Sequence, residues 1–128
     1  VTETMEKLDL ALAGQRVYEL IWNEYCDWYI ELVKKRLWSE DEDDKKIVRT
    51  VLVYLLKNML KLLHPYMPFI TEEIWSHLPH KRVEEVREGY LISAVWPKAS
   101  ECRNFPEEEA VLKIAMDSIT AIRNNNIQ

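Results

Sequence analysis

A chain of 128 residues with a formal net charge of −5 is long enough to bury one hydrophobic core. Its composition is 48% apolar with only two glycines, which favours long helices, and the absence of a long uncharged apolar run excludes a membrane span. The negative charge argues against a general nucleic-acid binder, and Cys26 and Cys102 form no CxxC pair that would indicate structural zinc.

The first third of the chain is predicted to form the end of one helix and then a long second helix. Residues 1–8 read as a helix end, so the chain is expected to be a fragment of a longer protein. Asp9 can cap the next helix, which runs over 10–38 without a proline. Gly14 costs about 1 kcal/mol relative to Ala inside a helix, so another backbone is expected to approach it closely.

Apolar residues recur every three or four positions along this helix and form a wide stripe. The aromatic side chains in the stripe could serve as a base-stacking platform, but the regular spacing favours core packing, with Trp28 inside the core. The stripe comprises Gly14, Val17, Tyr18, Ile21, Trp22, Tyr25, Trp28, Tyr29, Leu32 and Val33.

A second long helix is predicted to follow, with Ser39 as its cap and five consecutive acids at 40–44 near its start. Carboxylates are favoured at the positive N-terminal end of a helix, so this run is expected to be a solvated first turn. Residues 45–71 contain no acid, and the core face of the helix is Val48, Val51, Leu52, Leu55, Leu56, Met59, Leu62 and Leu63.

Positive charges gather at the end of the first long helix and along the second. On the second helix, four of them fall opposite its core face within one arc, namely Lys46, Arg49, Lys57 and Lys61. Charged residues on a helix usually form a solvated face, but such a face usually mixes positive and negative charges. The stripe of one sign therefore leaves two interpretations open, a solvated face or a surface that binds an anionic partner. The eight residues are Lys34, Lys35, Arg36, Lys45, Lys46, Arg49, Lys57 and Lys61.

A proline corner at 64–68 is predicted to end the second long helix and start a third. Pro65 cannot continue a helix, whereas Pro68 suits a first helical turn. The apolar Tyr66 and Met67 are expected to be buried in this corner. A short turn is expected at 83–88, an extended strap anchored by Trp96 at 90–96, and a last helix opening at Pro106.

Two stretches, HPYMPFITEEIW at 64–75 and YCDWYIEL at 25–32, resemble the anticodon-binding helical domain of class I aminoacyl-tRNA synthetases, specifically the valyl-tRNA synthetase family. A weaker likeness lies in Trp96-Pro97 and in TAIR at 120–123, after which the asparagines at 124–126 depart from the family's pattern of a second basic residue. The resemblance implies an all-α helical bundle of four or five helices, with one domain over 1–128. It also implies that the bundle contacts the anticodon arm of the tRNA that accepts valine.

The residues expected to contact RNA are the eight cations of the stripe together with Trp38. Lysines and arginines on a rigid helix hold phosphates, and loop bases are recognised by stacking and by hydrogen bonds to their edges. Trp38, at a helix end beside the basic cluster, is the stacking candidate. The alternative is a helical interaction module that binds an acidic protein partner.

No motif for catalysis or for nucleotide binding occurs, and the histidines and cysteines do not have the spacing of metal ligands. The fragment is therefore expected to be catalytically inert, without cofactor or metal. The resemblance implies that the longer parent enzyme joins valine to tRNA with ATP and Mg in a separate catalytic domain. That catalytic domain is the partner expected for this fragment within the same chain. No signal peptide is visible at the start, so a cytoplasmic protein without membrane contact is expected. The fragment is also expected to be a monomer.

Overall fold

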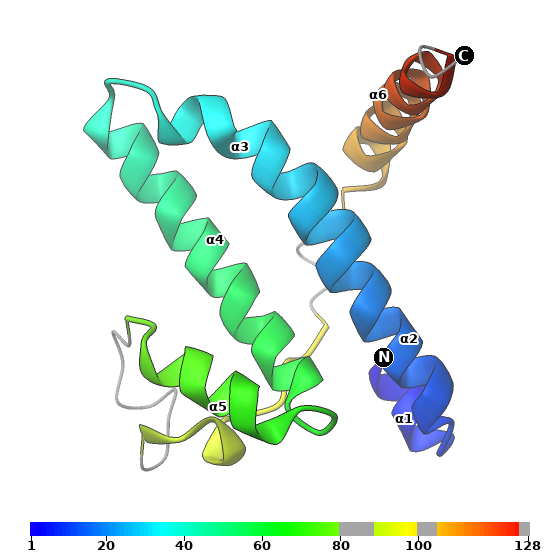
Figure 1. The fold of residues 1–128 in the computed structure, drawn as a ribbon, viewed down its shortest axis with the longest axis vertical. Helices are drawn as coiled ribbons and strands as arrows, with labels where there is room; N and C mark the ends of the chain where they lie inside the picture. The colour runs from blue at the N-terminus through cyan, green and yellow to red at the C-terminus, as the bar shows by residue number, and fades with distance from the viewer. Residues whose placement is uncertain (80–88, 100–104, 126–128) are drawn as a thin grey trace. The chain divides into compact units, whose positions relative to one another are not determined.

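The computed structural model describes residues 1–79, 89–99 and 105–125, and Figure 1 shows that their regular elements are helical. The chain divides into two compact units, Val1–Pro97 and Lys98–Gln128, and each is described by itself. The described residues form five helical rods and no strand when α2, η1 and α3 are taken as one continuous rod, which confirms the predicted all-α class. The turn expected at 83–88 and Cys102 lie outside the described residues.

The first unit begins with the short helix α1 (Thr2–Glu6) and turns sharply into α2 (Leu10–Glu19). The turn places Leu8 in the left-handed region, with φ of 59°. Asp9 caps α2 as predicted, because its Oδ1 accepts a hydrogen bond from the Leu12 N–H at 3.0 Å.

The long rod continues from α2 through the π-helix η1 (Leu20–Tyr29) into α3 (Ile30–Leu37). A π-helix widens the turn, and ten consecutive residues are unusual because such segments are mostly single turns. The Tyr25 hydroxyl donates to the Leu52 carbonyl at 3.3 Å and so ties the rod to the next helix. Burial raises the pKa of this Tyr25 hydroxyl.

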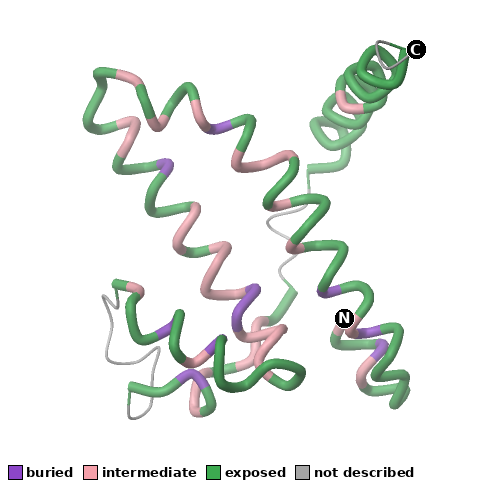
Figure 2. Tube along the Cα trace, viewed as in Figure 1, coloured by how far each residue is buried: buried purple, intermediate pink, exposed green. Residues whose placement is uncertain are grey.

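The predicted core stripe of the rod is buried only in part, as the exposed stretches of the rod in Figure 2 show. Val17 and Val33 are buried, whereas Tyr18, Trp22 and Leu32 are 61%, 55% and 50% exposed. The stripe is wide enough for more than one neighbour, and a single antiparallel helix can cover only one side of it. The prediction that the whole stripe lies in the core is therefore wrong.

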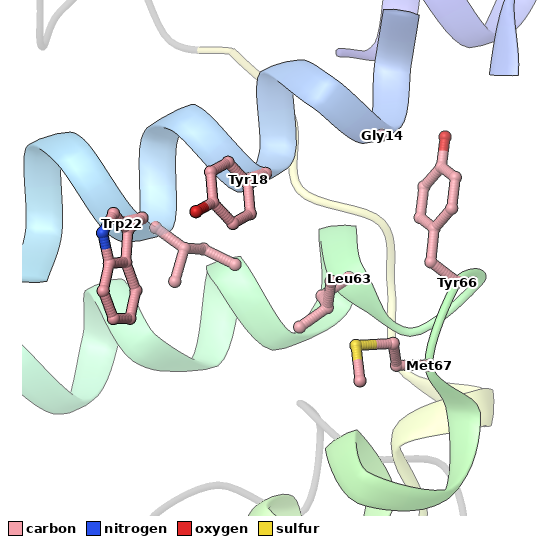
Figure 3. A pocket seen from close by; sticks show the side chains of 7 residues that line it. Gly14, Tyr18, Trp22, Leu63, Tyr66 and Met67 are labelled. Carbon is pink, nitrogen blue, oxygen red and sulfur yellow. The ribbon is translucent and has the colours of Figure 1, made fainter. Parts of the chain in front are cut away.

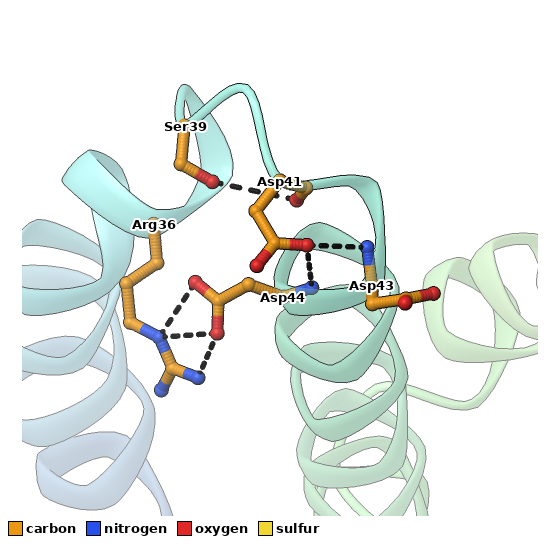
Figure 4. Close-up of polar contacts among 5 residues, drawn as sticks. All are labelled: Arg36, Ser39, Asp41, Asp43 and Asp44. Atoms are coloured by element: carbon orange, nitrogen blue, oxygen red, sulfur yellow. Dashed lines mark hydrogen bonds and ion pairs between the residues drawn. The ribbon is translucent and has the colours of Figure 1, made fainter.

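That antiparallel neighbour is α4 (Glu42–Leu63), which begins at Asp41 and not at the predicted Ser39 cap. Asp41 Oδ1 accepts from the N–H groups of Asp43 and Asp44 at 2.9 and 3.2 Å, while the Ser39 hydroxyl donates to the Asp41 carbonyl (Figure 4). An ionised carboxylate is a stronger acceptor for such donors than a hydroxyl, which explains the shift of two residues. Of the predicted core face, Val48 and Met59 are buried and Val51 is exposed.

The core of this unit lies where α5 (Pro68–Ser76) meets the end of α4. Leu60, Trp75 and Leu91 are buried there, and half-buried Leu56, Leu78 and Ala94 pack against them. The buried Leu91 comes from the 90–96 segment, which is not extended throughout because it contains the 3-10 helix η4 (Leu91–Ser93).

Two side chains hold that segment in place. The Glu72 carboxylate accepts from the Leu91 N–H at 2.8 Å and from the Ile92 N–H at 3.3 Å. The Trp96 indole N–H donates to Thr2 Oγ1 at 2.8 Å, which confirms Trp96 as an anchor of the strap and links it to α1.

The proline corner has the predicted ends, because α4 stops at Leu63 and Pro68 is the first residue of α5. It is not buried, since Tyr66 and Met67 are 37% and 51% exposed. The Tyr66 ring lies against Gly14, where an added Cβ would be 3.0 Å from Cε1, and its hydroxyl donates to the Leu10 carbonyl at 2.7 Å. Gly14 therefore accommodates a tyrosine ring, and not the backbone that was expected.

The second unit contains α6 (Pro106–Asn125), which opens at Pro106 as predicted. Glu107, Glu108 and Glu109 occupy its first turn and Arg123 its last, an arrangement that complements the helix dipole. Among the described residues, no helix is both long and apolar enough to cross a membrane.

Candidate nucleic-acid interface

Most of the predicted RNA-contact residues lie at one end of the α3–α4 pair. The two helices run antiparallel and are joined by residues 38–41, so the last turn of α3 and the first turns of α4 meet at this end (Figure 1). Lys34, Lys35, Arg36 and Trp38 come from the α3 side, and Lys45, Lys46 and Arg49 come from the α4 side. We call this set the junction cluster.

Three cations of the junction cluster are paired with acids. Arg36 binds the Asp44 carboxylate with its guanidinium, and its Nε lies 3.1 Å from each carboxylate oxygen (Figure 4). Lys34 Nζ is 2.6 Å from Glu31 Oε2 and Lys45 Nζ is 2.7 Å from Glu42 Oε1. The positive charge of the stripe is therefore partly neutralised by acids that lie next to it in the sequence, namely Glu31, Glu42 and Asp44.

Two of these pairs lower the pKa values of their acids, Asp44 and Glu42. The hydrogen bond from Arg36 lowers the pKa of Asp44, and the same bond raises the pKa of the Arg36 guanidinium. The hydrogen bond from Lys45, with a further contribution from the charge of Arg49, lowers the pKa of Glu42. Arg36 and Asp44 also join α3 to α4 and so fix the geometry of the junction.

The charge of the junction as a whole is balanced, because residues 31–49 contain six acids and six Lys or Arg residues. Lys35, Lys46 and Arg49 are exposed and form no ion pair with a described residue. Lys46 and Arg49 are separated by about one helical turn, so their side chains leave the same side of α4. These three are the cations best placed to hold phosphate oxygens.

Lys57 and Lys61 do not join this cluster. They follow Lys46 by at least three turns, about 17 Å along the axis of α4 at 1.5 Å per residue. Both are half-buried, and their Nζ atoms lie 5.8 and 5.9 Å from the centre of the Trp75 ring. Cations at this distance from an indole are attracted to its face, which indicates that both stabilise the α4–α5 contact.

Trp38 is the one uncharged residue of the junction cluster. It occupies the C-cap of α3, where its N–H donates to the Lys34 carbonyl at 3.1 Å, and its side chain is 80% exposed. An exposed indole beside cations that form no ion pair in the described part of the chain has the composition of a stacking site for an unpaired base.

The histidines of the described region have local roles. His64 Nδ1 is 2.9 Å from Thr71 Oγ1, so His64 links the end of α4 to α5 across the proline corner. His77 Nδ1 lies 2.9 Å from the Glu73 carbonyl, within α5 and its C-cap. No group of three or more metal-binding side chains is found in the described part of the chain.

Comparison with known proteins gives consistent results over almost the whole chain. Residues 1–127 match the family described as the anticodon-binding domain of tRNA ligase. A valine–tRNA ligase of Bacillus cereus is 43% identical over 125 residues, which are 97% of this chain and 13% of that relative. The valine–tRNA ligase of Geobacillus stearothermophilus has the same identity and coverage.

A third relative extends the alignment to the full chain. The valine–tRNA ligase of Staphylococcus saprophyticus is 38% identical over 128 residues, which are all of this chain and 14% of that relative. The chain thus spans about one seventh of the length of the curated relatives that it matches.

Proposed function

Because the chain belongs to the family of anticodon-binding domains of tRNA ligases, we propose that it binds the anticodon arm of a tRNA as part of a longer enzyme that joins valine to that tRNA. The valine assignment rests on the names of relatives that are 38–43% identical over nearly the whole chain. ATP and Mg would act in the catalytic part of the longer enzyme, which is also the partner of this domain. The enzyme would work in the cytoplasm, with this domain as a monomeric unit.

The observation that carries the proposal is the meeting of exposed cations and an exposed indole at the junction cluster. Lys35, Lys46 and Arg49 would hold phosphates on either side of the junction, and Trp38 would stack on an unpaired loop base. Phosphate contacts fix register, and the contact to the base adds selectivity.

The paired cations have a different part in this proposal. Arg36 is occupied by Asp44 and would hold the junction rigid, so that a phosphate meets a preformed surface. Lys34 and Lys45 can contribute only when the incoming phosphate competes with Glu31 and Glu42. Lys57 and Lys61, further along α4, would act through the long-range field and not through contacts.

Charge reversal on α4 tests the proposal. The triple variant Lys45→Glu, Lys46→Glu, Arg49→Glu should bind tRNA more weakly, because cations that hold phosphates are removed and carboxylates repel the backbone. The slope of log affinity against log salt concentration should flatten by roughly 0.7–0.9 for each phosphate that the variant no longer binds. In the longer enzyme, activation of valine with ATP needs no tRNA and should stay near the wild-type rate.

A matched control separates a local contact from a change of net charge. The variant Lys7→Glu, Lys98→Glu, Lys113→Glu alters the charge by the same amount at exposed positions outside the junction cluster. It should retain the affinity and the slope. Unaltered binding by the α4 variant, or equal loss of affinity in the two variants, would remove the junction cluster from the proposal.

A competition experiment addresses the other reading, in which the cations bind an acidic protein. Neither the family match nor the relatives support that reading. A polyacidic peptide of the same charge as the RNA should compete only weakly, because it offers no base to Trp38 and no fixed phosphate spacing. Competition as strong as that of the RNA itself would favour the protein-binding reading.

A further inference from the structure

An anionic ligand requires cations, and the apolar groove between the rod and the proline corner has none among its lining residues. Figure 3 shows this groove, whose walls are side chains such as Tyr18, Trp22 and Met67. The first turns of α4 differ from it, because they hold acids and bases in contact with one another. Control over the binding of RNA is therefore to be sought on α4.

One face of α4 combines a carboxylate with the α4 cations of the junction cluster. At 100° per residue, positions 42, 45, 46 and 49 fall within one arc of about 100° around the helix axis. Residues three and four apart on a helix are neighbours on its surface, so the carboxylate at position 42 lies beside the two lysines. We call this set the α4 face, and its members are Glu42, Lys45, Lys46 and Arg49.

Glu42 interacts with the cations of the α4 face. Its Oε1 lies 2.7 Å from Lys45 Nζ. The hydrogen bond from Lys45 lowers the pKa of Glu42, and the charge of Arg49 lowers it further. The side chain of Lys45 is 19% exposed and that of Glu42 is 77% exposed. The surrounding chain therefore positions the lysine, whereas the carboxylate that covers its ammonium group projects into water.

A carboxylate and a phosphate bind a lysine through the same kind of charge-assisted hydrogen bond. An RNA phosphate that approaches Lys45 meets a cation that is already occupied, and one that approaches Arg49 meets the negative charge of Glu42. We propose that Glu42 is a built-in competitor of the RNA, and that a phosphate can bind Lys45 only when the Glu42 carboxylate leaves it. The inference rests on the proposed function, because it concerns the regulation of the same site.

The pair of Glu42 and Lys45 is suited to such an exchange. Its members lie three residues apart on one helix, and an exposed pair of this kind contributes little to stability because water and salt screen it. The pair of Arg36 and Asp44 is different, because Asp44 is only 28% exposed in its side chain and the pair joins two helices. A phosphate can therefore replace Glu42 without loosening the junction of α3 and α4.

An internal competitor keeps the affinity for RNA below the value that the cations alone would give. The contact that Lys45 gains with a phosphate is offset by the contact that it loses with Glu42. The freed carboxylate also stays close to the negative RNA backbone and repels it. Both effects favour release of the RNA, which an enzyme that must part from its tRNA after each reaction requires.

Zero-length cross-linking in the longer enzyme tests the proposal without any substitution. A carbodiimide joins an amine and a carboxylate that are in contact as an amide, with loss of one water. The free enzyme should form this amide between Lys45 and Glu42. It should also form one between Lys7 and Glu3, whose Nζ and Oε1 atoms lie 2.8 Å apart. Mass spectrometry detects each amide in a peptide that trypsin no longer cuts at the lysine.

A saturating anticodon stem–loop hairpin with a 5′-hydroxyl end should suppress the amide of Lys45 and leave that of Lys7 unchanged. A hairpin that binds while the amide of Lys45 forms undiminished would overturn this inference and leave the proposed function in place. A hairpin that does not bind, as measured by fluorescence anisotropy, would overturn both. Equal suppression of the two amides would indicate general masking by RNA and would also overturn the inference.

Substitution of the competitor provides an independent check. Glu42→Gln should raise the affinity for the hairpin by up to about fivefold, the range that an exposed ion pair contributes. The slope of log affinity against log salt concentration should steepen by up to roughly 0.7–0.9, the value for one added phosphate contact.

Asp43→Asn is the matched control, because it removes the same charge from the same helical turn but no ion pair with a described residue. It should change the affinity and the slope less than Glu42→Gln does. Equal changes in the two variants would assign the effect to net charge alone and would contradict the proposal, as would unaltered binding by Glu42→Gln.

Discussion

Two tryptophans show how burial, and not residue type, decides how much a side chain contributes to the free energy of unfolding. The sequence predicts a core position for Trp28, which is half-buried, whereas Trp75 is 1% exposed between Leu60 and Leu91. Both occur in apolar patterns of helical spacing, so the sequence alone could not rank them. The ranking depends on which face of each helix finds a neighbour.

Trp75→Ala should therefore be the most damaging tryptophan substitution. Loss of a buried large aromatic costs about 3–5 kcal/mol of unfolding free energy, because a cavity remains. Trp38→Ala, at a side chain that is 80% exposed, should change stability by no more than about 0.5 kcal/mol. Urea denaturation of both variants provides the comparison, and similar losses of stability would contradict the position of the core.

The ion pairs of the junction make the stability of the folded chain depend on pH. Asp44 and Glu42 have ordinary pKa values of 3.8 and 4.5, and both are lowered in the folded chain. A lowered pKa means that folding favours the ionised form, so the stabilisation is complete above the ordinary value and is lost as the pH falls through the folded value.

Asp44→Asn should accordingly lower the urea midpoint at neutral pH, and the difference from the wild type should shrink as the pH falls below about 4. Asp43→Asn removes the same charge from the same helix turn but no ion pair with a described residue, and it should have the smaller effect at neutral pH. A difference between Asp44→Asn and wild type that persists undiminished in acid would show that the Arg36 pair is not its source.

At the scale of elements, the strap is held by one carboxylate that its sequence position does not reveal. Glu72 lies in the N-terminal half of α5, where a carboxylate complements the helix dipole, yet it accepts hydrogen bonds from two N–H groups nineteen and twenty residues away. Glu73, its neighbour, is 72% exposed in its side chain and stays near His77. The Glu72 contact depends on how the chain returns to α5, which local patterns do not encode.

Glu72→Ala should release η4 from α5. Hydrogen bonds to a charged acceptor contribute about 1.5–3 kcal/mol, so stability should fall by this order, and amide exchange at Leu91 should accelerate. Glu73→Ala is the matched control and should leave that exchange rate unchanged. Slow exchange at Leu91 in the Glu72 variant would mean that the buried Leu91 side chain alone holds the segment.

The elements themselves were largely predictable, because their signals are local. Asp9 before an uninterrupted helical pattern, Pro65 and Pro68 around a corner, and Pro106 before three acids each mark a helix end through their own backbone chemistry. The Ser39 cap failed because two possible caps stood two residues apart, and the carboxylate of Asp41 is the stronger acceptor. The π-helix and the exposed side of the rod were not predictable, since both depend on packing between elements.

At the scale of the whole molecule, charge is separated along the chain in a way that the net value conceals. Residues 17–33 carry only acids and residues 45–71 carry only bases, and residues 31–49, which span the change, carry six of each. The candidate RNA-contact residues could be named from this pattern and remain a prediction. The pairing of Arg36 with Asp44 could not be predicted, because it joins two helices. This pairing reduces the number of cations available to a ligand.

Recognition of an anticodon arm by this chain can be measured with two RNA hairpins of equal length from the same tRNA. One carries the anticodon stem and loop and the other the acceptor stem, so that their phosphate charges match and the salt term is common to both. We predict at least about tenfold tighter binding of the anticodon hairpin, equivalent to about 1.4 kcal/mol, and loss of that preference in Trp38→Ala. Equal affinity for the two hairpins, or a preference that survives the loss of Trp38 together with Lys35, Lys46 and Arg49, would contradict it.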